Sequence, residues 1–502
     1  MVNLEIMNRQ GNSISLDENT LTALKDRFNG SLLRSQDQDY DAARSVWNGV
    51  IDKKPALIAR CHEVADVMAA VNFAREHDLL FSVRAGGHNV SGSAIAERGL
   101  VIDVSHMRSV QVDAQKRLAR VEGGARLGDL DHETAPYGLA APVGVVSETG
   151  VAGLTLHGGT GWLLRKHGMS IDNLNAVEIV TADGQLLRAS QNEHPDLFWA
   201  LRGGGGNFGV VTSFEFTLHP VGPKVAIALP IYPMEKAREV MTACRDYMEK
   251  AGDDLMALGI YWSAPAVPEV PEEHQGKPAA ILLAVYTGPA DQAQRVLDPL
   301  RTFCKPIADL SDTMNWTEAQ KLLDEDYPDG NFYYWKSIYL DHLNDEAMAV
   351  LEHYTLRRPS PESSIDVWYL GGASARVSPS ATAFYNRHYP IMIGIEANWS
   401  DQGDSEANIA WARSLHKDLQ PFSSGGNYLN FPGFVEDREV MLRGAYGENL
   451  DRLQQVKRRY DPNNMFPGLL NIAPGQKLDN AAHSTSEKRS KERIGRNDYS
   501  TV

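Results

Sequence analysis

Residues 82–94, with the sequence SVRAGGHNVSGSA, place a histidine directly after two adjacent glycines. Glycine pairs allow the backbone to approach a ligand closely, because no Cβ intervenes. The loop is not a phosphate-binding P-loop, since no Lys followed by Ser or Thr stands at the required spacing. His88 is the residue of this loop that can do chemistry, because imidazole is a competent nucleophile near neutral pH.

Two further glycine-rich segments are VGVVSETGVAGLTLHGGTGW at 143–162 and LRGGGGNFGVV at 201–211. In the second, Gly204, Gly206 and Gly209 have GxGxxG spacing, but a dinucleotide fingerprint needs a strand before it and a helix after it. Here a helical pattern precedes the glycines and an alternating strand pattern follows them. This order excludes a Rossmann site. Three such loops together favour a long phosphate-bearing cofactor lying along bare backbone, whose amides can hold a pyrophosphate.

A carboxylate stands in the apolar run YPIMIGIEANW at 389–399. On a strand, the isoleucines at 391, 393 and 395 share one face, and Met392, Gly394, Glu396 and Asn398 share the other. Glu396 therefore either faces a cavity, where burial would raise its pKa and suit a general base, or forms a salt bridge at the end of the strand. Further candidates for a pocket on the same sheet are Tyr334, Trp335, Lys336, Tyr369 and Tyr385.

The elements that must position these residues follow from hydrophobic periodicity. Strands are predicted at 55–59, 80–86, 99–105 and 117–125, a helix at 62–78, and a hairpin at 176–190 with its turn at Asp183-Gly184. Beyond residue 220 the glycines thin out, and a long helical run at 233–252 is followed by aromatic, extended runs at 331–340, 365–377 and 389–399. The pattern predicts an α+β fold with a second domain built on an antiparallel sheet.

Composition bounds the function classes. The chain has 502 residues and a net charge of −16, which argues against nucleic acid or an anionic membrane as the main partner. We find neither a signal segment nor an apolar run long enough to span a membrane. Cys61, Cys244 and Cys304 form no CxxC pair, and the histidines lack metal-ligand spacing. We expect a cytoplasmic, reduced protein without a metal.

Four motifs carry a resemblance to a known family. The sequences VRAGGHNVSG, SETGVAGLTLHGGTGWLLRKHGMSIDNL, LRGGGGNFGVVTSFEF and YDPNNMFPGLLNI resemble the berberine-bridge-enzyme-like branch of the vanillyl-alcohol-oxidase flavoproteins over residues 40–475. The resemblance implies a two-part FAD-binding domain of the PCMH type, formed by residues 1–220 and 425–475. It implies an inserted substrate domain, residues 221–424, whose antiparallel sheet, flanked by helices, forms a ceiling over the flavin. We expect residues 476–502, which are charged and poor in apolar residues, to be a disordered tail.

The resemblance also implies a role for His88, which stands where the family bonds histidine to the 8α-methyl of FAD. The alternative is a loop histidine that hydrogen-bonds a phosphate. Many relatives carry a second link through a cysteine, but Val146 stands at that place and no cysteine lies between Cys61 and Cys244. A single covalent link is therefore expected. The implied contacts with FAD are His88, Arg84, Gly86, Gly87, Asn89, Val90, Gly92, Val146, Ser147, Thr149, Gly150, Gly153, Leu154, Gly159, Gly161, Trp162, Gly209, Val210, Tyr428 and Asn430.

Two candidates for the catalytic base remain open. In GGNYLNFP, Tyr428 and Asn430 match the family's YxN motif, whose tyrosine takes the substrate proton. A free tyrosine has a pKa near 10 and would need a cationic or hydrogen-bonding neighbour to act at neutral pH. The alternatives are a packed aromatic ring at Tyr428 and a base at Glu396.

The resemblance implies an enzyme that oxidises a small or medium alcohol, amine or phenolic compound. Thr149 falls near the oxygen-reactive face of the flavin, and its small size favours an oxidase that reduces O2 over a dehydrogenase with another acceptor. A flavin-fold binding protein without catalysis is the alternative from a different class. His157 stands where relatives commonly have glycine, and the sequence leaves both a pocket position and a solvent-facing position open for it. The oligomeric state is not predicted.

Overall fold

The computed structural model describes residues 3–475, so the predicted disordered tail lies outside the described residues. Strands near the N-terminus form a four-stranded sheet in the order β3-β4-β6-β5, in which β4, β6 and β5 run parallel. Helix α3 begins with a capping box at Glu63 and Asp66, which satisfies free backbone amides of its first turn. The elements of this layer are β1 (Leu4–Met7), β2 (Ser13–Leu16), α1 (Glu18–Lys25), β3 (Ser31–Leu33), α2 (Tyr40–Arg44), β4 (Leu57–Arg60), α3 (Val64–Glu76), β5 (Phe81–Arg84) and β6 (Leu100–Asp103).

A five-stranded antiparallel sheet follows, in the order β11-β10-β12-β8-β7. Its hairpin β10/β11 turns at Asp183-Gly184, where the Thr181 amide donates to the Gln185 carbonyl at 3.0 Å, which confirms the predicted hairpin. Helix α7 precedes the glycine run and strand β12 follows it, which confirms that the run is not a Rossmann site. The elements are β7 (Val110–Asp113), β8 (Leu118–Glu122), α4 (Leu127–Thr134), β9 (Leu139–Ala140), α5 (Val151–Leu156), α6 (Leu164–His167), β10 (Leu174–Val180), β11 (Leu186–Ser190), α7 (Pro195–Leu201), β12 (Val210–Thr217) and β13 (His219–Pro220).

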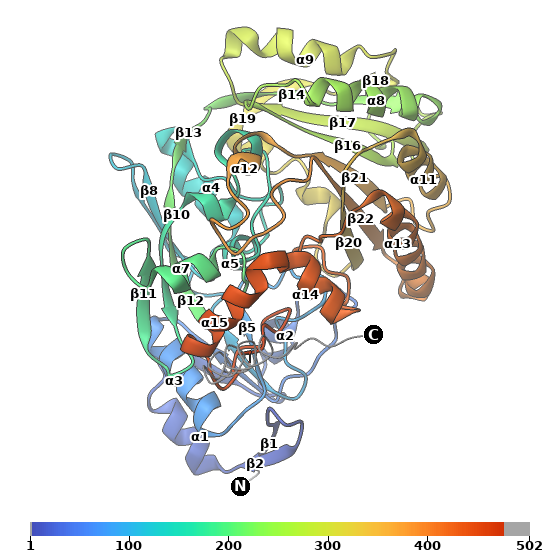
Figure 1. Cartoon of the computed structure of the whole chain (residues 1–502). Coiled ribbons are helices and arrows are strands. Elements are labelled where there is room, and N and C mark those ends of the chain that lie inside the picture. The colour runs from blue at the N-terminus through green and yellow to red at the C-terminus, as the bar shows by residue number, and fades with distance from the viewer. Residues whose placement is uncertain (1–2, 476–502) are drawn as a thin grey trace, which may run out of the picture.

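The middle of the chain forms a nine-stranded antiparallel sheet, which lies at the top and right of Figure 1. Its main path is β18-β15-β17-β16-β21-β22-β20, and β14 pairs with β17 and β19 at one side. The elements are β14 (Lys224–Ala228), β15 (Pro230–Pro233), α8 (Ala237–Met248), β16 (Leu255–Ser263), β17 (Pro278–Tyr286), α9 (Ala293–Arg301), β18 (Ala308–Asp309), β19 (Asp312–Asn315), α10 (Trp316–Ala319), β20 (Phe332–Leu340), α11 (Asp345–Thr355), β21 (Ser364–Tyr369), α12 (Gly372–Arg376), β22 (Ile391–Trp399) and α13 (Ser405–Leu419).

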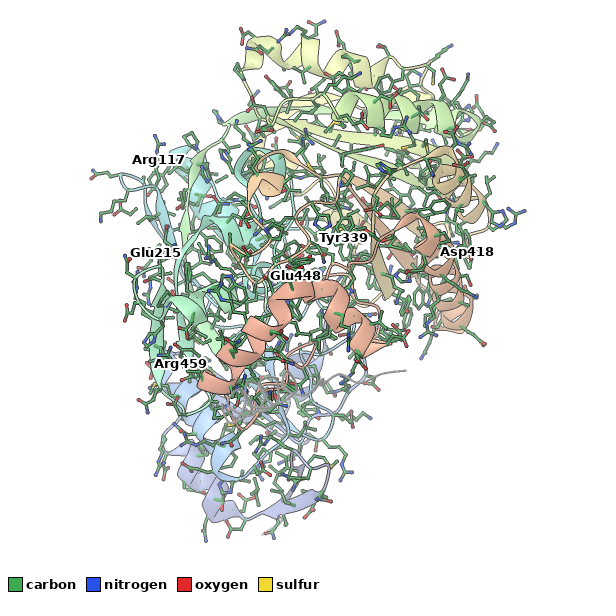
Figure 2. The ribbon with its side chains drawn as sticks, in the orientation of Figure 1. Arg117, Glu215, Tyr339, Asp418, Glu448 and Arg459 are labelled. Atoms are coloured by element: carbon green, nitrogen blue, oxygen red, sulfur yellow. The ribbon has the colours of Figure 1, made fainter. Side chains whose placement is uncertain are left out.

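The two faces of this sheet have different partners. The isoleucines at 391, 393 and 395 pack in one core with residues of helices α8, α11 and α13, whereas Met392 belongs to a second core together with Tyr428. The predicted alternation along 391–399 is therefore confirmed. The second face looks toward the glycine-rich half, and Tyr339 of β20 lies in the interior between the two halves (Figure 2).

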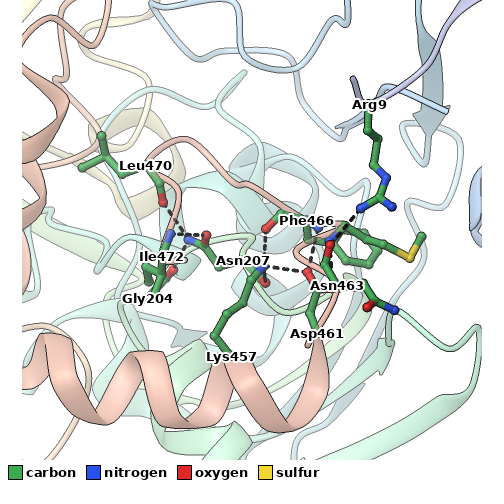
Figure 3. Close-up of polar contacts among 10 residues, drawn as sticks. Arg9, Gly204, Asn207, Lys457, Asp461, Asn463, Phe466, Leu470 and Ile472 are labelled. Carbon is green, nitrogen blue, oxygen red and sulfur yellow. Dashed lines mark hydrogen bonds and ion pairs between the residues drawn. The ribbon is translucent and has the colours of Figure 1, made fainter. Parts of the chain in front are cut away.

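The last helices, α14 (Arg438–Tyr446) and α15 (Leu450–Tyr460), return to the first half of the chain, where α15 packs against α7. Lys457 anchors this return, because its buried ammonium donates to the Asp461 carboxylate at 2.6 Å and to the carbonyls of Asn207 and Phe466 (Figure 3). Asn207 in turn donates to the Leu470 carbonyl and accepts from the Ile472 amide. Residues from both ends of the chain thus form one unit, as the fold class predicts, while the boundaries at 220/221 and 424/425 stay predictions. No helix within residues 3–475 is long and apolar enough to cross a membrane.

Candidate active site

A cavity of about 340 Å³ lies between the glycine loops and the inner face of the nine-stranded sheet. The glycine loops supply residues 85–89, 144–146, 149–150 and 152–154, and the sheet supplies Trp335, Asp366, Trp368, Met392 and Glu396. Residues 466–469, at the end of the described chain, close another side. Segments from the whole length of the chain therefore meet at one site.

Two of the glycine loops touch through their backbones. A Cβ added at Gly86 would lie 2.5 Å from the Gly150 Cα, and one added at Gly150 would lie 2.8 Å from the Gly86 Cα. Such distances are impossible for real side chains, so only glycine allows these two loops to meet. The result is a cradle of bare backbone along the cavity, of the kind that holds a pyrophosphate.

His88 borders the cavity at the end of an aromatic stack. Its ring lies 4.1 Å from that of Trp47 with an angle of 13° between the planes, and the other face of Trp47 lies 3.7 Å from Tyr333. Among the described residues no partner hydrogen-bonds the buried Nε2 of His88. Burial lowers the pKa of His88 to about 3, so the imidazole is neutral, and hence a nucleophile, at neutral pH. The neutral ring and the bare backbone beside it fit an FAD molecule bound along these loops.

Trp47 is held in place by the chain on both sides. Its indole Nε1 donates to the Tyr327 carbonyl at 2.8 Å, and the Gly330 amide donates to the Trp47 carbonyl at 2.9 Å. The next residue, Asn48, donates to the carbonyls of Val90 and Tyr333. The orientation of the His88 ring is thus set by the segment that follows helix α2 and by strand β20.

Tyr428 presents its hydroxyl to the cavity as a hydrogen-bond donor. The oxygen accepts from the Thr160 amide at 3.1 Å and from the Asn430 side chain at 2.9 Å, so its own hydrogen remains free for a ligand. Burial raises the pKa of Tyr428, and the lining contains no Lys or Arg that would lower it again. The phenol is therefore protonated at neutral pH.

Glu396 and Asp366 form a carboxyl pair on the ceiling of the cavity. They lie on the neighbouring strands β22 and β21, where Ser364 pairs with Glu396 and Asp366 with Gly394, so both side chains leave the same face of the sheet. Each is 3% exposed. Burial, together with the charge of the neighbour, raises the pKa of Glu396 well above its usual value, and burial raises that of Asp366 to about 7. Glu396 accepts from the Tyr327 hydroxyl at 2.7 Å, so it faces a cavity and does not form the end-of-strand salt bridge that was the alternative.

Comparison with known proteins agrees with this geometry. Residues 55–190 match the family model of the FAD binding domain, and residues 427–472 match the model described as berberine and berberine like. An uncharacterised FAD-linked oxidoreductase of Bacillus subtilis, YgaK, is 32% identical over 459 residues, which cover 90% of this chain and 98% of that protein. The chain belongs to the berberine-bridge-enzyme-like family of FAD-linked oxidoreductases.

Two further comparisons concern members of the family named as oxidases. (R)-6-hydroxynicotine oxidase of Paenarthrobacter nicotinovorans is 31% identical and covers 89% of this chain and 97% of its own length. The crystal structure of 6-hydroxy-D-nicotine oxidase from Arthrobacter nicotinovorans superposes with a TM-score of 0.80 at 30% identity, covering 89% of this chain and 98% of that one. The chain is thus an FAD-linked oxidoreductase, and the predicted fold class is confirmed.

The predicted contacts with FAD divide into two groups. Lining the cavity are Gly86, Gly87, His88, Asn89, Val146, Thr149, Gly150, Gly153, Leu154, Gly209, Val210, Tyr428 and Asn430. The other predicted contacts do not line the cavity and instead pack or form hydrogen bonds within the protein. For example, Ser147 donates to Asp324, and Arg84 donates to the Ala43 carbonyl. This second group consists of Arg84, Val90, Gly92, Ser147, Gly159, Gly161 and Trp162, and for both groups a contact with FAD stays a prediction.

Sequence reasoning missed some residues of the site and misplaced others. Asp366, Tyr327 and Trp368 line the cavity but stand in runs without a motif, and their pairing partners are distant in sequence. Tyr334 and Tyr369 were wrong as pocket candidates, because they pack on the helix-covered face of the sheet. Lys336 also faces away and lies 3.5 Å from Glu436. His157 does line the cavity, and its Nδ1 lies 3.0 Å from the Gly153 carbonyl.

Proposed function

We propose that this protein is an FAD-dependent oxidase whose flavin is attached through His88 alone and whose substrate is a small or medium alcohol, amine or phenolic compound. The observation that carries the proposal is the neutral His88 ring at the cavity, between the glycine loops and the ceiling carboxyls. Val146 lines the cavity where a second, cysteinyl link would start, and valine cannot form one. The small Thr149 beside it leaves room for O2. The oxidases among the relatives at 30% identity or above support the choice of reaction.

Bound FAD supplies the two-electron acceptor of the reaction. The side chains of the protein orient the substrate and accept its proton. Glu396 is the proposed base, since it lines the cavity and burial raises its pKa, which makes the ionised carboxylate a stronger proton acceptor. Tyr428 donates its free hydroxyl hydrogen to the substrate and orients it, with Thr160 and Asn430 fixing the phenol. We also infer a reducing, cytoplasmic setting, because all three cysteines are free thiols.

The choice between an oxidase and a dehydrogenase is tested by reoxidation. The holoenzyme is reduced with dithionite under anaerobic conditions and mixed with air-saturated buffer while the flavin absorption is followed. We expect rapid return of the yellow colour with one H2O2 formed per flavin. Slow return in air, with fast return on adding a quinone or dye, would assign a dehydrogenase instead.

Trp47→Leu is expected to slow the attachment of flavin to His88. Without the stacked indole the imidazole loses its fixed orientation, and misplacement of a reacting group costs about 10- to 100-fold in rate. The rate is measured by mixing apoprotein with FAD and counting the flavin that stays with acid-precipitated protein. Trp262→Leu is the matched control, because Trp262 lies on strand β16 and donates to the carbonyl of Glu362, in the turn before β21. Equal rates in wild type and Trp47→Leu would contradict the positioning role of Trp47.

A further inference from the structure

The ceiling carboxyls surround a hollow that a glycine keeps open. A Cβ added at Gly394 would lie 3.4 Å from Oε1 of Glu396, 3.5 Å from the Asp366 Cβ and 3.5 Å from the Phe431 ring. These three side chains therefore converge on the space above Gly394. The hollow is therefore bordered by acidic side chains and by the aromatic ring of Phe431, and Trp335 and Trp368 line the same cavity.

Neither carboxyl has a cationic partner among the described residues. Glu396 accepts from the Tyr327 hydroxyl, and Asp366 accepts from the Ser364 hydroxyl at 2.9 Å. The lining of the cavity contains no Lys or Arg, and burial lowers the pKa of its two histidines, His88 and His157, so both are neutral. Buried carboxylates are normally paired with a cation, because an isolated charge in such a site is costly.

The net charge of the two ceiling carboxyls, Asp366 and Glu396, depends on whether a cation is bound beside them. Asp326 and Tyr327 are the other titratable groups that face it, and neither brings positive charge. Because the pKa of both carboxyls is raised, they share at least one proton at neutral pH, and the empty pair holds at most about one negative charge. A cation in the hollow would neutralise that charge, would favour loss of the shared proton, and would be attracted to the aromatic faces.

We propose that the substrate carries a basic amine whose ammonium group binds in the hollow over Gly394, between Asp366 and Glu396. This inference rests on the proposed function and names its substrate class. The bound ammonium then passes one N–H proton to Glu396, which leaves a neutral amine and a protonated carboxyl. Substrates with a carboxylate or phosphate at the same position are excluded by repulsion.

The test uses three probes of similar shape and different charge on the oxidised holoenzyme: phenethylammonium, 2-phenylethanol and phenylacetate. Perturbation of the flavin absorption reports their dissociation constants. The ammonium ion is expected to bind about 10- to 100-fold more tightly than the alcohol, and phenylacetate least tightly, since hydrogen bonds to a charged group are that much stronger. Its affinity is expected to rise as the pH rises through about 7, where Asp366 loses its proton and the pair gains negative charge.

Isosteric variants test whether the two carboxyls cause the preference for the ammonium ion. Asp366→Asn and Glu396→Gln are each expected to weaken ammonium binding about tenfold and to leave the alcohol within about threefold. Glu346→Gln, an exposed carboxyl on helix α11, is the matched control and leaves all three constants unchanged. If a variant does not fold, the inference is still tested by the wild type, through its preference for the ammonium probe over the other two and through the pH dependence of that binding.

Equal or weaker binding of the ammonium ion compared with the alcohol, or no saturable binding of it, overturns the inference. That outcome leaves the proposed function standing when the flavin is covalent and reduced enzyme consumes O2. Failure of the proposed function appears separately, as flavin released by acid or as slow reoxidation in air.

Discussion

Glu396→Gln is expected to lower the rate of flavin reduction by substrate about 10²- to 10⁴-fold, the usual contribution of a positioned base. Glutamine keeps the shape of the side chain and its contact with Tyr327 but cannot take a proton. The wild-type rate should rise with pH, because burial and Asp366 raise the pKa of Glu396 and only the ionised carboxyl accepts a proton. The variant should lose this rising limb. Anaerobic stopped-flow mixing at several pH values measures both effects.

Tyr428→Phe distinguishes the two candidate bases. The phenol is protonated at neutral pH, so its removal should weaken substrate positioning and lower the rate less than Glu396→Gln does. Wild-type rates in Glu396→Gln, combined with a loss of several orders of magnitude in Tyr428→Phe, would reverse the assignment of the base. Glu346→Gln controls for a general effect of removing a carboxylate.

Lys457→Met is expected to lower the free energy of unfolding by about 3–5 kcal/mol, because it leaves Asp461 buried without its cation. Both side chains are 0% exposed, and the ammonium also donates to the Phe466 carbonyl and to the Asn207 carbonyl, which joins the C-terminal segment to the glycine run. Urea denaturation followed by circular dichroism measures the loss. The same variant should bind FAD less tightly, since residues 466–469 line the cavity.

Two further variants make this prediction specific. Lys417→Met removes an exposed lysine of α13 and should change stability by less than about 0.5 kcal/mol. The double variant Lys457→Met/Asp461→Asn removes both charges and should be more stable than Lys457→Met alone. A single variant as stable as wild type would show that the buried pair does not hold the two ends of the chain together.

Some features could be predicted from the sequence because they depend on the residue pattern of a single segment. The alternation of isoleucines with Glu396 on β22 placed the carboxylate on the face opposite the isoleucines, because side chains alternate strictly along a strand, and the structure shows that this face borders the cavity. The helix before and the strand after 203–209 were sufficient to exclude a dinucleotide fold. The hairpin at Asp183-Gly184 followed from its turn residues.

Contacts between distant segments left no such signal. Trp47 stacks on His88 and Tyr333, which come from three separate parts of the chain, and nothing in the sequence around Trp47 indicates a partner. Asp366 belongs to the site because of the register of β21 against β22, which the sequence does not reveal. Tyr334 and Tyr369 were misplaced because an aromatic run alone does not indicate which face of a sheet a residue takes.

We propose that a covalent bond to His88 holds the flavin. It is tested most directly by precipitating the purified protein with acid and measuring flavin in the pellet and in the supernatant, for wild type and for His88→Ala. We expect flavin in the wild-type pellet and, for His88→Ala, flavin only in the supernatant. Flavin in the supernatant of the wild type would contradict it and would leave His88 as a residue that binds FAD without a bond.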